Sequence, residues 1–239
     1  MFEWLNPMKS TIFGILSKLQ IKASCLLDGV NQKMYGRQGR NVGTAWRGLE
    51  IVISRKPHSL IDIGSGSGTH AEEFRKSGIK VKTLDFGSSV YSASSTNPPD
   101  FVGNFYDIQI NEKFECVWAS HVLEHQPNAG QFLSRCRELI EKDGYIAVTV
   151  PPAKPIIVGG HLSIWNEGLL IYNLVRSGFD CLNATVVRHG YNITVIAPLA
   201  QDVPQSATFD SGDLADLRGR LPKSLRWLDE DAFYGGSFF

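Results

Sequence analysis

Four side chains in this 239-residue chain are well placed to donate a lone pair to a metal ion or to a proton. Three lie in the segment HVLEH at residues 121–125, and the fourth is His161. If the segment opens a helical turn, its i, i+3 and i+4 spacings place His121, Glu124 and His125 on one face. Imidazole and carboxylate groups bind zinc, iron, nickel, manganese or magnesium. Alternatively, His121 or His125 acts as a metal-free general base, since imidazole titrates near pH ~6.5, or the residues serve only the structure.

A glycine-rich loop, DIGSGSGT at residues 62–69, is the second candidate for chemistry. Its glycines allow a tight turn and a close approach of the backbone to a ligand. The spacing differs from the dinucleotide-binding fingerprint, because the sixth position counted from Gly64 is Thr69. Asp62 precedes the first glycine and can accept hydrogen bonds from the loop or lie near a cationic ligand. Asp85 follows about 20 residues later, as acids that bind two ribose hydroxyls do.

Alternating strand and helix patterns place both motifs in an α/β fold with a mostly parallel sheet. The loop follows a short apolar run, and the HVLEH segment follows another, so both lie at the carboxyl ends of strands. Two final runs are joined only by His189-Gly190, which predicts an antiparallel hairpin. The predicted strands are 59–63, 79–84, 101–102, 114–119, 145–150, 179–188 and 191–198, and the predicted helices are 44–55, 69–77, 129–141 and 166–177.

In this order the motifs resemble those of the class I S-adenosylmethionine-dependent methyltransferases, over roughly residues 59–198. The resemblance includes the segments GNFYDI at 103–108 and ASHVLEH at 119–125. It implies a Rossmann-like seven-stranded sheet in the order 3-2-1-4-5-7-6, with strand 7 antiparallel and helices on both faces. It also implies S-adenosylmethionine as the cofactor, held by Asp62, Gly64, Gly66, Gly68, Asp85, Asp107, Ile108 and Ser120.

The HVLEH segment is also similar to the Glu-x-x-Glu-His motif of metal-dependent O-methyltransferases, such as those of ubiquinone biosynthesis and the small-RNA terminal 2′-O-methyltransferases. This similarity implies a divalent ion held by His121, Glu124, His125 and His161, which would lower the pKa of the acceptor hydroxyl. His121 replaces the first acid, which favours softer ions than magnesium. Leu-Glu-His also occurs in members of the superfamily with no known metal, so the metal, the histidine base and a structural role stay open.

The charge balance bears on the acceptor. The chain has 24 basic and 24 acidic residues, giving no net charge, whereas a nucleic-acid-binding protein usually has a basic excess. A small-molecule or saccharide hydroxyl is therefore the favoured acceptor. The alternatives are an RNA 2′-O-methyltransferase and a catalytically silent module that binds the cofactor. The loop of residues 35–40, with Arg37 and Arg40, is a candidate for contact with an anionic substrate.

The predicted organisation is an N-terminal helical cap at 1–57, a methyltransferase domain at 58–200 and a C-terminal appendage at 201–239 packed on the core. The pattern of residues 1–19 predicts an amphipathic helix rather than a signal peptide. No apolar run approaches the ~20 residues of a membrane span. The four cysteines include no CxxC pair, which fits a reducing cytoplasm.

Overall fold

The computed structural model describes residues 45–88, 98–203, 213 and 217–222. The predicted amphipathic helix at 1–19, the loop at 35–40 and most of the predicted C-terminal appendage at 201–239 lie outside these residues. The predicted divisions at residues 57 and 200 remain predictions.

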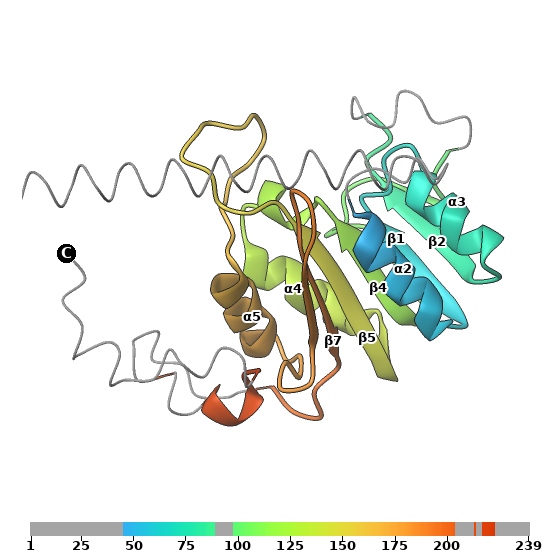
Figure 1. Cartoon of the computed structure of the whole chain (residues 1–239). Coiled ribbons are helices and arrows are strands. Elements are labelled where there is room, and N and C mark those ends of the chain that lie inside the picture. Colours follow the sequence, from blue (N-terminus) through green and yellow to red (C-terminus); the bar gives the residue numbers. More distant parts are fainter. Residues whose placement is uncertain (1–44, 89–97, 204–212, 214–216, 223–239) are drawn as a thin grey trace, which may run out of the picture.

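The described chain is built around one seven-stranded sheet in the order β3-β2-β1-β4-β5-β7-β6 (Figure 1). The five strands β1 to β5 are parallel, and β7 runs antiparallel to both β5 and β6, which confirms the predicted fold. The strands are β1 (Ser59–Ile63), β2 (Lys80–Asp85), β3 (Phe101–Val102), β4 (Phe114–Ser120), β5 (Ile140–Val150), β6 (Thr185–Arg188) and β7 (Ile193–Pro198).

Helices cover both faces of this sheet (Figure 1). The helices are α2 (Trp46–Arg55), α3 (Thr69–Lys76), α4 (Ala129–Glu138) and α5 (Glu167–Arg176), with the short 3-10 helices η2 (Leu123–His125) and η3 (Arg218–Arg220). Successive side chains of a strand point to opposite faces, and the central strands are apolar on both because helices bury both faces of the sheet. Trp118 of β4 packs with Leu49 of α2 and Phe74 of α3, whereas Val117 packs with the α4–α5 side. No helix in the described ranges is both long and apolar enough to span a bilayer.

Three of the four cysteines lie in the described part of the chain. Cys116, Cys136 and Cys181 are buried free thiols, and Cys25 lies outside the described residues. Burial raises the pKa of all three thiols, which suits packing rather than nucleophilic chemistry.

The predicted helix at 129–141 is three residues too long. α4 ends at Glu138, and β5 already begins at Ile140, which pairs with Phe114. The register then shifts, so that Cys116 pairs with Tyr145. Gly144 lies in this irregular stretch, where an added Cβ would meet the carbonyl oxygen of Glu115 at 2.5 Å. Pairing within the sheet therefore places residues 140–141 in a strand, although their local pattern favoured a helix.

The final hairpin is also shorter than predicted. β6 covers only residues 185–188 of the predicted 179–188, because Phe179 instead forms an isolated bridge with Leu199. The turn is centred on Gly190 and Tyr191 rather than on His189-Gly190. The amide of His189 donates to the carbonyl of Asn192 (3.1 Å), and Gly190 has φ +54°. This shift of the turn brings Asn192 to the end of the sheet where β5 finishes.

Candidate active site

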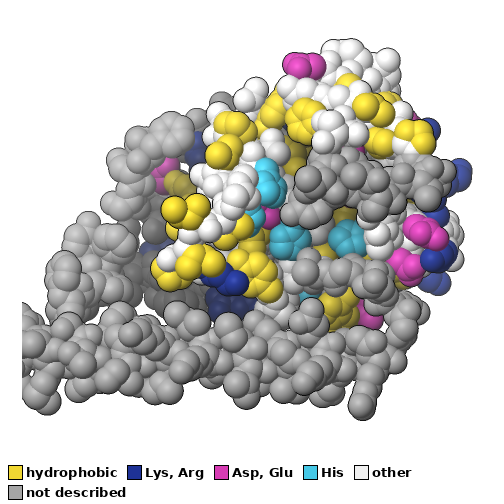
Figure 2. All heavy atoms as spheres, turned by 90° about the horizontal axis from the view of Figure 1, so that it is seen from above, with side chains coloured by type: hydrophobic (Ala, Val, Ile, Leu, Met, Phe, Trp, Pro, Cys, Tyr) yellow, Lys and Arg dark blue, Asp and Glu magenta, His cyan; other side chains and the backbone are white. Residues whose placement is uncertain are grey.

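The predicted site residues lie along the carboxyl edge of the parallel strands, at the top of Figure 1. The segment that follows β5 rises above this edge (Figure 1). Viewed from above, histidine side chains gather near the middle of this face, with hydrophobic side chains around them (Figure 2). In open α/β sheets, ligands bind at this edge because the loops that follow the strands surround a crevice there.

The glycine loop turns sharply between β1 and α3. Gly64, Gly66 and Gly68 have φ values of +70°, +52° and +78°, which is the left-handed region that glycine adopts without a steric penalty. A Cβ on Gly64 would lie 2.4 Å from Cγ2 of Val122, whereas a Cβ on Gly68 would meet no atom within 4 Å. The loop is thus packed against the HVLEH segment at one end and open at the other.

Two buried acids, Asp62 and Asp85, lie next to this loop. Asp85 accepts hydrogen bonds from the amides of Gly66 and Gly87, both at 2.9 Å, one on each carboxylate oxygen. A carboxylate has about four lone-pair sites, so each oxygen retains capacity for a ligand hydroxyl. Burial, and then the negative charge of Asp85, raises the pKa of Asp62 from its ordinary 3.8 to about 7. Oδ2 of Asp62 has no hydrogen-bond partner, so a cationic ligand would relieve an unfavourable arrangement.

The remaining predicted cofactor residues differ in their hydrogen bonding: the amides of Asp107 and Ile108 have partners, whereas the hydroxyl of Ser120 has none. The amides of Asp107 and Ile108 both donate to the carbonyl of Asn104, at 3.0 and 3.1 Å. The amide of Ile108, one of the predicted cofactor residues, thus already has an internal partner. Ser120, at the end of β4, has a buried Oγ with no hydrogen-bond partner, which suits a polar ligand.

His121 is held by hydrogen bonds through both ring nitrogens. Nδ1 lies 3.1 Å from Oε1 of Glu124, and Nε2 lies 2.6 Å from Oδ1 of Asn192. Burial disfavours the charged ring, but the hydrogen bond and the charge of Glu124 outweigh it and raise the pKa of His121. A ring that donates from both nitrogens has no lone pair to offer to a metal ion or to a proton.

The other three predicted metal ligands come together. Glu124, His125 and His161 each offer one ligand atom, and these atoms lie within 4.8 Å of one another. Nδ1 of His125 lies 2.8 Å from the carbonyl of Gly160, so it carries the proton and leaves the lone pair on Nε2. Glu124 is fully buried, and its Oε2 has no hydrogen-bond partner. This donor set fits a divalent ion.

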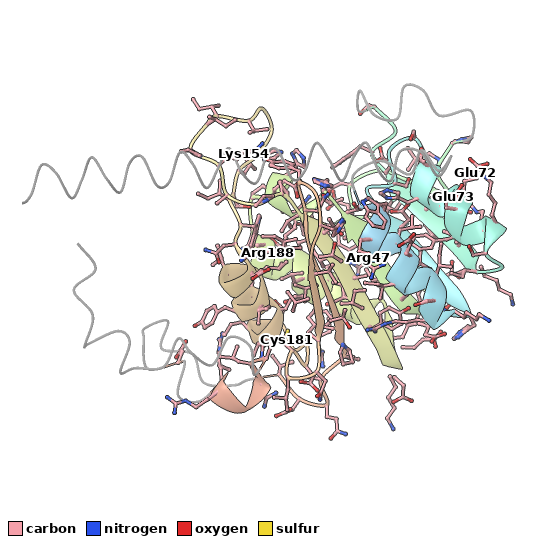
Figure 3. The ribbon with its side chains drawn as sticks, viewed as in Figure 1. Arg47, Glu72, Glu73, Lys154, Cys181 and Arg188 are labelled. Atoms are coloured by element: carbon pink, nitrogen blue, oxygen red, sulfur yellow. The ribbon has the colours of Figure 1, made fainter. Side chains whose placement is uncertain are left out.

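Asn192 is a site residue that the sequence did not identify. Its contact with His121 spans 71 residues of the chain, and it depends on the turn lying at 190–191 rather than at 189–190. The only local signal was an asparagine close to a tight turn. The loop after β5 also reaches this turn, since Nζ of Lys154 lies 3.6 Å from the ring centroid of Tyr191. Figure 3 shows Lys154 on that loop above the sheet edge.

A hollow of about 440 Å³ lies between α2 and the β6–β7 hairpin. Trp46, Arg47 and Glu50 line it from the helix, and residues 187–190 line it from the hairpin. The Arg188 side chain turns to the α5 side of the hairpin, where it is paired with Glu167 (Figure 3). Arg47, which also lines this hollow, is paired with the exposed Glu50 one turn further along α2, at 3.3 Å.

Comparison with known proteins places these features in a family context. A family model described as a methyltransferase domain matches residues 44–176, more than half of the chain. Among curated proteins, a ubiquinone biosynthesis O-methyltransferase of Rhodopseudomonas palustris (strain HaA2) is 30% identical over 96 residues. A protein of the same name from Nitrobacter winogradskyi is 29% identical over 97 residues. The first match covers 37% of this chain and 38% of the relative, and the second covers 38% and 37%.

Solved structures share the fold at low sequence identity. A Burkholderia thailandensis 1,6-didemethyltoxoflavin-N1-methyltransferase, bound to 1,6-didemethyltoxoflavin and S-adenosylhomocysteine, aligns with a TM-score of 0.55 at 18% identity. This alignment covers 77% of this chain and 90% of that protein. A putative methyltransferase in complex with the Haloferax volcanii Trm112 activator aligns with a TM-score of 0.54 at 15% identity, covering 73% and 96%. The family match, together with the sheet order and the glycine loop, shows that the chain belongs to the methyltransferase domain family.

Proposed function

We propose that this protein transfers the methyl group of S-adenosylmethionine to a hydroxyl oxygen of a small molecule or saccharide. The observation that carries the proposal is the contact between the two motifs, because Val122 of the HVLEH segment packs directly on Gly64 of the glycine loop. A cofactor on the loop would therefore lie beside the Glu124–His125–His161 cluster. The relatives named as O-methyltransferases support transfer to oxygen.

In this proposal the cofactor binds between the glycine loop and the acids beneath it. Asp85 holds the ribose through the lone pairs that the loop amides leave available. Asp62 faces the positive charge of the methionine portion, and Gly64, Gly66 and Gly68 let the backbone approach it. Asp107 and Ser120 supply further polar contacts.

The transfer is an in-line displacement in which the carbon–sulfur bond breaks as the carbon–oxygen bond forms. The methyl group is already activated, so the protein must align the acceptor and remove the hydroxyl proton. Glu124, His125 and His161 would hold a divalent ion, which lowers the pKa of a hydroxyl that it binds. If the site works without metal, Nε2 of His125 is positioned to take the proton, since its Nδ1 already donates to Gly160.

The charge balance supports a small acceptor rather than RNA. Equal numbers of basic and acidic residues give no long-range attraction for phosphates. The hollow between α2 and the hairpin is of a size that suits a small ligand.

Calorimetry with S-adenosylmethionine, followed by detection of S-adenosylhomocysteine with hydroxylated acceptors, tests the proposal. Asp85→Ala should abolish cofactor binding, whereas Asp143→Ala, an exposed aspartate in β5, should not change it. Absence of binding at millimolar cofactor would refute the proposal. Binding without turnover on any acceptor would indicate a silent module instead.

A further inference from the structure

A series of hydrogen bonds connects the β6–β7 turn to the proposed metal cluster. Nδ2 of Asn192 donates to the carbonyl of His189 at 3.2 Å. Oδ1 of the same amide lies 2.6 Å from Nε2 of His121, and Nδ1 of His121 lies 3.1 Å from Oε1 of Glu124. The series links the turn at 189–192 to the segment after β4.

The bond to His189 sets the orientation of the Asn192 amide. Because its nitrogen is directed at a carbonyl, its oxygen faces His121 and can only accept. Nε2 of His121 then donates to this oxygen, and Nδ1 is engaged with the carboxylate of Glu124. One oxygen of Glu124 is thereby taken, and Oε2, which is buried and has no partner, is the one available to a ligand.

The backbone of His121 is consistent with a residue held in place by its surroundings. Its φ of +56° lies in the left-handed region, which is strained for a residue with a Cβ. Its amide donates to the carbonyl of Thr149 at 2.9 Å, which ties it to the end of β5. In this conformation the imidazole lies between Asn192 and Glu124.

We propose that Asn192 is a positioning residue, which acts through His121 to fix Glu124 for binding a divalent ion. His121 is then not a ligand in this chain but the group that orients one. This inference rests on the metal cluster of the proposed function. Partners that orient a metal ligand commonly change metal affinity 10- to 100-fold when they are removed.

Titration of the full-length protein with Mn²⁺, followed by electron paramagnetic resonance of the free ion, tests the inference. Asn192→Leu should weaken Mn²⁺ binding about tenfold or more, and Asn192→Asp, which keeps an acceptor oxygen, should restore part of the affinity. Asn183→Leu, on an exposed residue of the loop before β6, is the matched control and should bind as the wild type does.

A double-mutant cycle separates positioning from a general loss of structure. His121→Asn removes the imidazole but keeps a residue type that tolerates a positive φ. If Asn192 acts through His121, Asn192→Leu should cause little further loss of affinity in the His121→Asn background. Equal losses in both backgrounds, or no loss in either, would overturn the inference alone. Failure of the wild type to bind Mn²⁺ would overturn the metal assignment and the inference with it.

Discussion

Replacing Asp62 with asparagine should change how stability depends on pH. The pKa of this carboxyl rises from its ordinary 3.8 to about 7 in the folded protein, first because of burial and then because of Asp85. The folded state therefore keeps the proton to a higher pH than the unfolded chain does. The protonated carboxyl therefore makes its full contribution to the free energy of unfolding below about pH 4, and this contribution is lost as the pH rises to about 7.

The magnitude follows from the difference between the two pKa values. Each pKa unit of difference corresponds to about 1.4 kcal/mol of unfolding free energy, so the shift from 3.8 to about 7 amounts to about 4 kcal/mol. Between pH 5 and pH 8 the wild type should lose about 2–3 kcal/mol that Asp62→Asn does not lose. The asparagine side chain has nearly the same shape but carries no proton that titrates in this range.

Urea unfolding of both proteins without cofactor, followed by tryptophan fluorescence at pH 5, 6, 7 and 8, measures this difference. The free energy of unfolding of the variant should rise relative to that of the wild type with increasing pH. Asp143→Asn, at an exposed position, should give a difference that does not vary with pH. A flat or falling difference for Asp62→Asn would refute the burial argument.

Three further predictions concern the cofactor and the metal cluster. The affinity for S-adenosylmethionine should rise about tenfold from pH 6 to pH 8 as Asp62 ionises, and calorimetry should find no such rise in Asp62→Asn. Gly64→Ala should lower the free energy of unfolding by about 2 kcal/mol or more, because the strain of a positive φ and the clash with Val122 add. Gly68→Ala should show only the cost of a positive φ, about 1 kcal/mol. Chemical denaturation measures both, and equal losses would contradict the packing argument. Mn²⁺ should raise the unfolding midpoint of the wild type and of His58→Ala, but not of His161→Ala, and an equal rise in all three would exclude the cluster.

Local patterns were sufficient to predict the sheet and the glycine loop. The buried strands have apolar runs with acids at their ends, and the loop needs glycines at three positions with positive φ. These features depend on residues close together in the chain, so spacing alone identifies them. The strand order followed from the resemblance together with the short join before the last strand.

Two predicted boundaries, the end of the helix at 129–141 and the turn of the last hairpin, were wrong because pairing with strands distant in the sequence overrides local preference. Residues 139–141 have a helical pattern, but the partner strand at Phe114 draws Ile140 into the sheet. The turn of the last hairpin shifted by one residue because the register is set by β7 pairing with β5. A shift of one residue decides which side chain faces a neighbour.

The sequence by itself determined that this chain is an α/β methyltransferase domain with a glycine loop, acids beneath it and a histidine-rich edge. Only the tertiary structure separated the four candidate ligands, grouping Glu124, His125 and His161 and engaging both ring nitrogens of His121. The partner that engages His121 is Asn192, 71 residues further along the chain. Spacing can show that a side chain has a lone pair to give, but the three-dimensional arrangement of its neighbours decides whether that lone pair is available.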